Sequence, residues 1–85
     1  MPSQVPPRIN IVLRDQTGGE VHFQVPLTAV FHRILSAWCK RKNLDIHGMR
    51  LLFDGQKLKL DATPGQMDMG DGDVIDVVME QIGGA

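Results

Sequence analysis

The chain has one cysteine, no tyrosine and no long hydrophobic segment. Because Cys39 has no possible partner within the chain, no internal disulfide can form, and nothing favours an oxidising compartment. The longest uncharged apolar run is far too short for a helix that crosses a bilayer, which excludes membrane insertion by that route. We therefore expect the protein to act in the nucleus and cytoplasm.

An excess of charge of either sign is also missing. Nine lysines and arginines oppose ten aspartates and glutamates, which gives a formal net charge of -1. A balance this close to neutral creates no overall field that would attract nucleic acid or an acidic membrane surface. Any electrostatic recognition must therefore be local, and we expect a monomer with neither nucleic acid nor membrane as a direct partner.

Eighty-five residues allow one small domain. Three prolines among the first eight residues disfavour helix and strand, so residues 1–8 are predicted to be a short disordered lead. Periodic apolar patterns place the domain at residues 9–80. Residues 81–85 follow as a predicted flexible tail that contains Gly83 and Gly84. Consecutive glycines let a main chain lie extended in a channel too narrow for other residues.

The first half of the domain has the pattern of a hairpin followed by a helix. Residues 9–13 and 21–25 are β-branched and alternating, with turn residues between them, and so predict two antiparallel strands. Apolar residues then recur at the spacing of one helix face: Phe31, Ile34, Leu35 and Trp38. We expect Thr28 to be the N-cap, the helix to run to about Lys42, and Asn43 to form a left-handed C-cap.

The second half contains three further predicted strands. Residues 49–53 form one, and the Asp54-Gly55 turn leads into a short strand at residues 57–60. Thr63-Pro64 has the order of an N-cap followed by proline at the first helical position, which predicts one helical turn through about residue 67. Residues 74–79 are almost continuously apolar, which indicates a central strand.

This element order predicts an α+β fold. A mixed sheet of four or five strands must bury one face against a single long helix, with a short helical turn before the last strand. No second layer of helices is available, so the other face of the sheet is left without a helical cover.

From Ile9 to Gly84 the chain resembles the SUMO family of ubiquitin-like modifiers, and the Asp54-Gly55 turn and residues 68–73 look a little closer to its plant-type members. The matching segments occur in the family's order with almost its spacing: Val21-His22-Phe23, Trp38-Cys39, Arg50-Leu51-Leu52-Phe53-Asp54-Gly55-Gln56, Thr63-Pro64, Gly72-Asp73-Val74-Ile75-Asp76-Val77 and Gln81-Ile82-Gly83-Gly84. The resemblance implies the ubiquitin-like β-grasp fold, in which the last strand lies in the middle of the sheet beside the first.

The resemblance also implies how the tail is used. Gly84, preceded by Gly83, would be joined through its carboxylate to a target lysine by an isopeptide bond. Ala85 would first have to be removed, because activation needs the carboxylate of Gly84 to be free. Gln81 and Ile82 would complete the segment that activating, conjugating, ligating and deconjugating enzymes recognise. The domain itself would be a substrate, not an enzyme, and would need no cofactor.

A second candidate site lies between the second strand and the helix. The strand presents alternate apolar residues on one face, and the helix carries a stripe in which a small residue separates two arginines. An edge strand beside such a trough accepts an extended peptide as an additional strand. SUMO-like proteins hold short hydrophobic interaction motifs in this way. The predicted groove consists of Val21, His22, Phe23, Gln24, Val25, Arg33, Ile34, Ala37 and Arg41.

Composition alone favours another interpretation of this surface, in which the apolar residues are core and the arginines a solvated helix face. The resemblance reverses that preference. The chain nevertheless has Gln24, Pro26 and Ala37 where family members commonly have lysine, lysine and serine. We therefore expect weaker binding of these motifs, with less preference for acidic flanks.

Other candidate sites are weaker. Leu58-Lys59-Leu60-Asp61 matches the loose acceptor pattern of SUMO-type modifiers and makes Lys59 a possible acceptor lysine. The histidines and aspartates lack metal-ligand spacing, and Cys39 has the character of a core residue, so no metal or catalytic site is predicted. Two other functions stay open: an adaptor domain of the same fold that is never conjugated, and a sulfur carrier whose terminal glycine becomes a thiocarboxylate.

Overall fold

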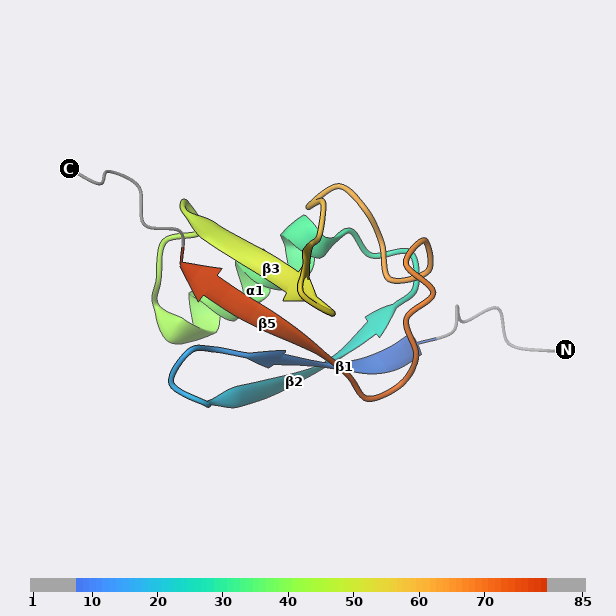
Figure 1. Ribbon diagram of the computed structural model, residues 1–85, viewed down its shortest axis with the longest axis horizontal. Helices are drawn as coiled ribbons and strands as arrows, with labels where there is room; N and C mark the ends of the chain where they lie inside the picture. The colour runs from blue at the N-terminus through green and yellow to red at the C-terminus, as the bar shows by residue number, and fades with distance from the viewer. Residues whose placement is uncertain (1–7, 80–85) are drawn as a thin grey trace, which may run out of the picture.

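The computed structural model describes residues 8–79, which form one sheet packed on one helix (Figure 1). Apolar and polar residues alternate strictly along Glu20–Pro26, as the period of two requires for a strand with one covered face. The elements in chain order are β1 (Arg8–Arg14), β2 (Glu20–Pro26), α1 (Phe31–Lys42), β3 (Met49–Phe53), β4 (Gln56–Lys57) and β5 (Asp73–Met79).

The sheet has the strand order β2-β1-β5-β3-β4. β5 runs parallel to β1 and antiparallel to β3, so the sheet is mixed and its last strand is central, as expected (Figure 1). A nearly continuous apolar strand suits this place, because both of its edges are hydrogen-bonded and one face is buried. The strand that leads to the tail is therefore held from both sides.

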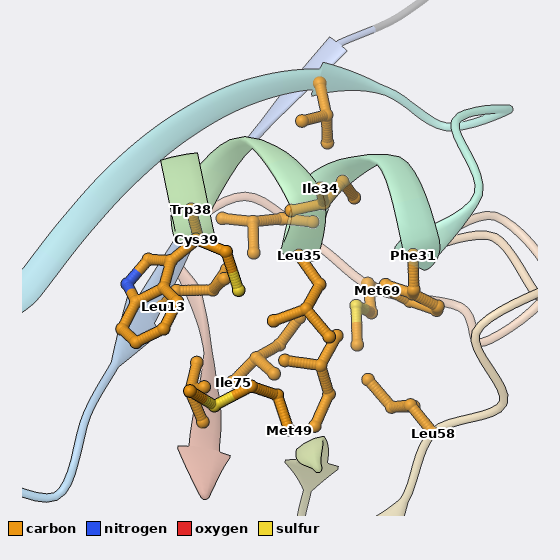
Figure 2. Packing of buried hydrophobic residues seen from close by; sticks show 14 residues of the cluster. Leu13, Phe31, Ile34, Leu35, Trp38, Cys39, Met49, Leu58, Met69 and Ile75 are labelled. Atoms are coloured by element: carbon orange, nitrogen blue, oxygen red, sulfur yellow. The ribbon is translucent and has the colours of Figure 1, made fainter. Parts of the chain in front are cut away.

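The core lies between the sheet and α1 (Figure 2). Leu35 of the helix and Ile75 of β5 are both fully buried there. The cluster consists of Ile11, Leu13, Val25, Phe31, Ile34, Leu35, Trp38, Cys39, Met49, Leu51, Leu58, Met69, Ile75 and Val77. The four apolar helix residues predicted from their spacing are all among them, which confirms the predicted helix face. No helix in residues 8–79 is long and apolar enough to cross a membrane.

The two ends of α1 differ from each other in how they are capped. The predicted N-cap at Thr28 is wrong: the helix begins at Phe31 after Val30, an extended residue with no side-chain cap bond. The N–H groups of Phe31 and His32 instead donate to the carbonyls of Ala62 (2.9 Å) and Leu60 (2.8 Å). A distant loop thus satisfies the helix N-terminus, which local sequence could not indicate.

The predicted C-cap is confirmed. Asn43 is left-handed, with φ 58° and ψ 45°, and the Leu44 N–H donates to the carbonyl of Cys39 at 2.9 Å. Asn tolerates this conformation better than most side chains, and this bond satisfies one of the last helix carbonyls. Lys40, Arg41 and Lys42 occupy the last turn, where positive charge complements the helix dipole.

The segment after β3 is less regular than predicted. The Asp54-Gly55 turn forms with φ values of 54° and 77°, as expected for this residue pair. The strand predicted at residues 57–60 is wrong in extent, since β4 contains only Gln56–Lys57. Leu58 follows β4: its N–H still donates to the Leu51 carbonyl (2.9 Å), and its side chain enters the core, where it is 7% exposed.

No helix forms at Thr63-Pro64, contrary to the prediction, but Thr63 makes the cap hydrogen bonds that its sequence predicted. The Thr63 N–H donates to Gln66 Oε1 (3.1 Å), and the Gln66 N–H donates to Thr63 Oγ1 (3.2 Å). These reciprocal bonds form a capping box. The Met67 N–H is shared between the carbonyls of Pro64 (3.1 Å) and Thr63 (3.3 Å), and the Asp68 N–H bonds three residues back to Gly65 (3.2 Å), so consecutive turns form in place of a regular α-helix.

The described part of the chain begins and ends in paired strands. Arg8, placed in the lead by the sequence, is the first residue of β1 and pairs with Pro26 of β2. At the other end, β5 ends at Met79 opposite Met49 of β3. The predicted lead before Arg8 and the predicted tail after Glu80 lie outside the described residues.

Candidate functional site

The tail residues Gln81, Ile82, Gly83, Gly84 and Ala85 lie outside the described residues, but the place where the tail begins is described. Met79 is the last residue of β5, and its side chain is 52% exposed. Since β5 is paired with β1 on one side and with β3 on the other, the tail follows a strand that is anchored at both edges.

The predicted groove combines residues of β2 and α1. Val25 and Ile34 are buried, at 7% and 3% exposed, and form its floor. Val21 and Phe23 are half-buried on the same face of β2. The Arg41 guanidinium lies 5.9 Å from the centre of the Phe23 ring, within the range of a cation–π interaction. Strand and helix side chains therefore meet across this face.

The helix side of the groove carries an exposed basic rim. Arg33 and Arg41 are exposed, and Ala37 between them is half-buried. Within residues 8–79 no ion pair joins either arginine to a carboxylate. Their charge is therefore available to a ligand that lies along β2.

Two of the predicted groove residues, His22 and Gln24, can contribute only main-chain groups to the groove. Alternation along β2 places His22 and Gln24 on the opposite face of the sheet from Phe23, and both are exposed. His22 Nδ1 lies 3.2 Å from Asn10 Nδ2 on that face. Within the described part of the chain, β2 pairs only with β1, so its other edge offers free N–H and C=O groups.

Lys59, the possible acceptor lysine, is exposed in the loop after β4. The preceding Leu58 belongs to the core, and the Ala62 N–H donates to the Lys59 carbonyl at 3.0 Å. The lysine amine is thus accessible, while the aliphatic residue of the acceptor pattern is not.

The structure also shows where the histidines and the cysteine lie, for which the sequence predicts no metal or catalytic role. His22, His32 and His47 lie on β2, on α1 and in the loop before β3. Among residues 8–79 no three His, Cys, Asp or Glu side chains come close enough to hold a metal ion. Cys39 is 3% exposed, and burial raises the pKa of its thiol, which disfavours the reactive thiolate.

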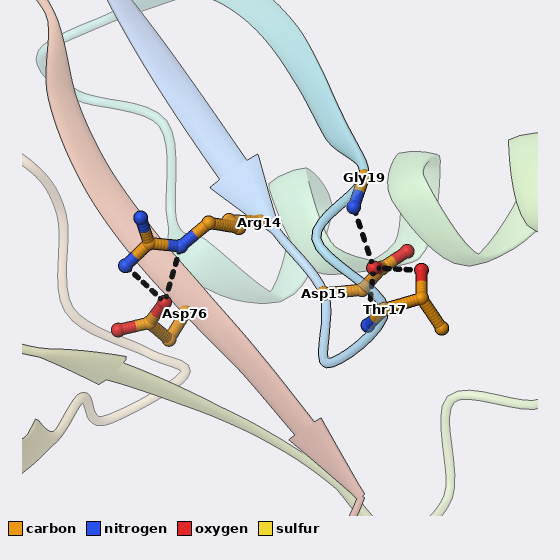
Figure 3. A network of polar contacts seen from close by, with 5 residues as sticks. All are labelled: Arg14, Asp15, Thr17, Gly19 and Asp76. Carbon is orange, nitrogen blue, oxygen red and sulfur yellow. Dashed lines mark hydrogen bonds and ion pairs between the residues drawn. The ribbon is translucent and has the colours of Figure 1, made fainter.

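The turn between β1 and β2 is organised around Asp15 (Figure 3). Its Oδ1 accepts hydrogen bonds from the Thr17 hydroxyl (2.6 Å) and from the N–H groups of Thr17 (2.9 Å) and Gly19 (3.0 Å). The Thr17 hydroxyl has the largest effect in lowering the pKa of Asp15 to about 2, and the backbone N–H groups and Lys42 add to it. Lys42 Nζ lies 3.4 Å from Asp15 Oδ2, which links the turn to the end of α1.

A hollow that the sequence did not predict lies beside this turn. It measures about 170 Å³ and is lined by residues 15–17 together with Trp38, Leu44, Met49, Val77 and Met79. We call it the tail-base pocket, because Met79 is the last residue before the tail. The signal in the sequence was Leu44, a large apolar residue directly after the helix C-cap.

The chain is similar to known proteins over most of its length. The family described as "Ubiquitin-2 like Rad60 SUMO-like" matches residues 9–79. The "Small ubiquitin-related modifier 2" of Arabidopsis thaliana is 36% identical over 76 residues, covering 89% of this chain and 74% of that protein. The "Ubiquitin-like protein pmt3/smt3" of Schizosaccharomyces pombe is 37% identical, covering 89% of this chain and 65% of that protein.

Among solved structures, the ubiquitin of Caldiarchaeum subterraneum matches with a TM-score of 0.81. The match covers 92% of this chain and all of that one, at 24% identity. This likeness confirms the predicted ubiquitin-like β-grasp fold.

Proposed function

The chain belongs to the SUMO-like family of ubiquitin-like proteins, and on this basis we propose that it is a protein modifier conjugated through Gly84. The observation that carries the proposal is the match over residues 9–79 to this family, followed directly by a segment that contains Gly83-Gly84 before Ala85. Small ubiquitin-related modifiers are among the relatives by name. Conjugation pathways of this kind require partner enzymes and target proteins.

The chemistry of attachment assigns a role to each tail residue. A protease removes Ala85, so that the carboxylate belongs to Gly84. Adenylation and thioester formation then activate that carboxylate, and a target lysine attacks it to form an isopeptide bond. Gln81, Ile82 and Gly83 lie along the enzymes' channels, where the absence of a side chain at Gly83 allows close approach.

In this proposal the catalytic groups belong to the partner enzymes. The chain supplies the carboxylate that is activated and a folded domain that the activating, conjugating and deconjugating enzymes bind. It requires no cofactor of its own, and it works in the nucleus and cytoplasm. Lys59 stays a prediction as an acceptor, since a buried Leu58 offers an enzyme little beyond the lysine itself.

Attachment is tested by incubating the protein with a SUMO-type activating enzyme, ATP and a processing protease. Mass spectrometry should show loss of Ala85 and a thioester to the enzyme that disappears on treatment with a thiol reductant. Gly84→Ala is the matched control and should abolish the thioester while leaving the domain folded. A wild-type protein that is neither trimmed nor charged would contradict conjugation and favour a non-conjugated adaptor.

We further propose that the groove between β2 and α1 binds short hydrophobic peptide motifs. The free edge of β2 offers backbone hydrogen bonds, Val25 and Ile34 give an apolar floor, and Arg33 and Arg41 give a basic rim. An extended peptide added to such an edge gains affinity from its main chain and specificity from its alternate side chains. Acidic residues that flank the motif increase the affinity of the peptide less here than in typical relatives, because Gln24 and Pro26 carry no charge.

Peptide binding is tested by NMR titration with an aliphatic-core peptide, with and without flanking acids. The acids should improve the dissociation constant only slightly in the wild type. Ala37→Lys, which adds a charge between Arg33 and Arg41 on the rim, should increase that improvement, whereas Lys57→Gln on the far edge strand β4 should not change it. Phe23→Ala should weaken both peptides alike. A gain of about tenfold from the acids in the wild type, about 1.4 kcal/mol, would contradict the proposed weak preference.

A further inference from the structure

Two of the three histidines, which are scattered in the sequence, line one hollow in the structure. His32 lies in the first turn of α1 and His47 in the loop before β3, and the hollow between them measures about 340 Å³. The segment after β4 forms another wall, since the His32 N–H donates to the Leu60 carbonyl at 2.8 Å. We call it the histidine hollow, and its lining consists of His32, Ile46, His47, Gly48, Met49, Arg50 and Leu60.

The ionisable side chains that line the histidine hollow are all of the type that carries positive charge. They are His32, His47 and Arg50, and no carboxylate is among the lining residues. Arg50 Nη1 donates to the Met49 carbonyl at 3.0 Å, which holds the guanidinium beside the start of β3. A surface concavity with charge of one sign attracts ligands of the opposite sign. The electrostatics of the hollow therefore favour an anionic ligand.

The carboxylate next to the hollow in sequence, Asp45, is already engaged by His47. Its Oδ1 accepts a hydrogen bond from the His47 N–H at 3.0 Å and lies 2.9 Å from His47 Nδ1. The backbone N–H first, and the ring second, hold the pKa of Asp45 below its ordinary value. Asp45 thereby favours a proton on Nδ1, so a second proton on this ring must go to Nε2. The side chain of His47 is 90% exposed, which leaves this second donor accessible to a ligand.

The floor of the histidine hollow is apolar. Ile46 and Leu60 are half-buried and pack against the core, and Met49 is 4% exposed. A volume of about 340 Å³ lies at the lower end of the range of about 300–1,000 Å³ that ligand sites occupy. An inorganic anion would use only the charged rim and would leave this floor uncovered. The combination instead matches a ligand that carries a large aliphatic group between negative charges.

We propose that the histidine hollow is a docking site for an acidic segment of a partner protein. The segment places one large aliphatic side chain against Ile46 and Leu60 and its carboxylates against His32 and His47. None of the lining residues belongs to the groove between β2 and α1, and none belongs to the tail. The site therefore does not depend on conjugation through Gly84 or on peptide binding along β2.

The test is an NMR titration of the full chain, without enzymes, with a blocked pentapeptide that has leucine between two pairs of acidic residues. Amide resonances of His32, residues 46–50 and Leu60 should shift, while those of β2 should not. Binding should be tighter at pH 5.5 than at pH 7.5, because histidine side chains gain charge over this range. A peptide with serine in place of leucine, a peptide with amides in place of the acids, and inorganic phosphate should each bind more weakly.

Matched histidine substitutions separate this site from a general effect of charge. Replacing both His32→Gln and His47→Gln should weaken the acidic peptide by about two- to fivefold at pH 5.5 and remove the dependence on pH. His22→Gln, at the third histidine on β2, should leave both unchanged. The exposed positions of all three side chains allow the fold to persist. Shifts confined to β2, equal binding of the serine peptide, or an unchanged affinity in the double variant would overturn the proposal.

Discussion

The two ends of α1 are stabilised by different parts of the chain. At the N-terminus, the donors of Phe31 and His32 bond to the carbonyls of Ala62 and Leu60, about thirty residues further along the chain. At the C-terminus, Asn43 turns the backbone left-handed, and the bonds are closed within five residues of sequence. One end therefore depends on tertiary structure and the other on local conformation.

This difference predicts which end opens first when the fold is weakened. A local cap persists as long as the helix does, because its partners are neighbours in sequence. A cap supplied by a distant loop is lost whenever that loop detaches. Because Lys42 also connects the C-terminal end to Asp15 of the hairpin turn, that end has two supports. We expect perturbations of the loop at residues 58–62 to loosen the N-terminal end alone.

Leu58→Ala should have the largest effect. It removes a buried side chain from the core beneath that loop, at a cost of about 2–5 kcal/mol of unfolding free energy. Urea unfolding measures the cost, and amide hydrogen exchange of Phe31 and His32 should accelerate more than that of Leu44. Substitution of the exposed neighbouring residue, Lys57→Ala, is the control and should change the unfolding free energy and the exchange rates only slightly. Equal acceleration at both ends would contradict the proposed difference.

Asn43→Val should come next. A β-branched residue in the left-handed conformation costs about 1–2 kcal/mol, whereas Asn43→Gly should be neutral or slightly stabilising because glycine adopts positive φ freely. Urea unfolding of the two variants measures the difference. If both substitutions had the same effect, the C-terminal end would not depend on backbone conformation.

Acid should weaken the C-terminal end by a smaller amount. The folded pKa of Asp15 is about 2, below its ordinary value of 3.8, so the ionised carboxylate stabilises the folded state. This contribution is complete above about pH 4 and is lost as the pH falls through about 2. Asp15→Asn removes it at every pH, so the difference in unfolding free energy between wild type and variant should shrink over that range. A difference independent of pH would refute the assignment.

Thr28→Ala should have the smallest effect. A true N-cap contributes about 1 kcal/mol, but Thr28 is an exposed turn residue that does not cap α1. Thermal and urea unfolding should therefore change by less than about 0.5 kcal/mol. A loss near 1 kcal/mol would show that Thr28 caps the helix in solution and would restore the expectation drawn from the sequence.

The same distinction explains how much of the structure could be predicted. The strands β1, β2, β3 and β5, the helix face, the Asn43 cap and the Asp54-Gly55 turn all depend on neighbours in sequence, and all were predicted correctly. The helix start and the short β4 depend on where Leu58 and the loop after it pack, which periodicity does not encode. The groove was predicted from alternation and four-residue spacing. The tail-base pocket was missed, because its lining comes from four separate segments.

The central position of β5 has a mechanical consequence. A protein attached to something through its C-terminus is pulled through that end whenever the attached molecule is moved or unfolded. Force on Met79 acts along β5, and its hydrogen bonds to β1 and to β3 are loaded together in shear instead of being opened one at a time. The sheet order thus places the C-terminal end of β5 where a pulling force loads two hydrogen-bonded ladders at once.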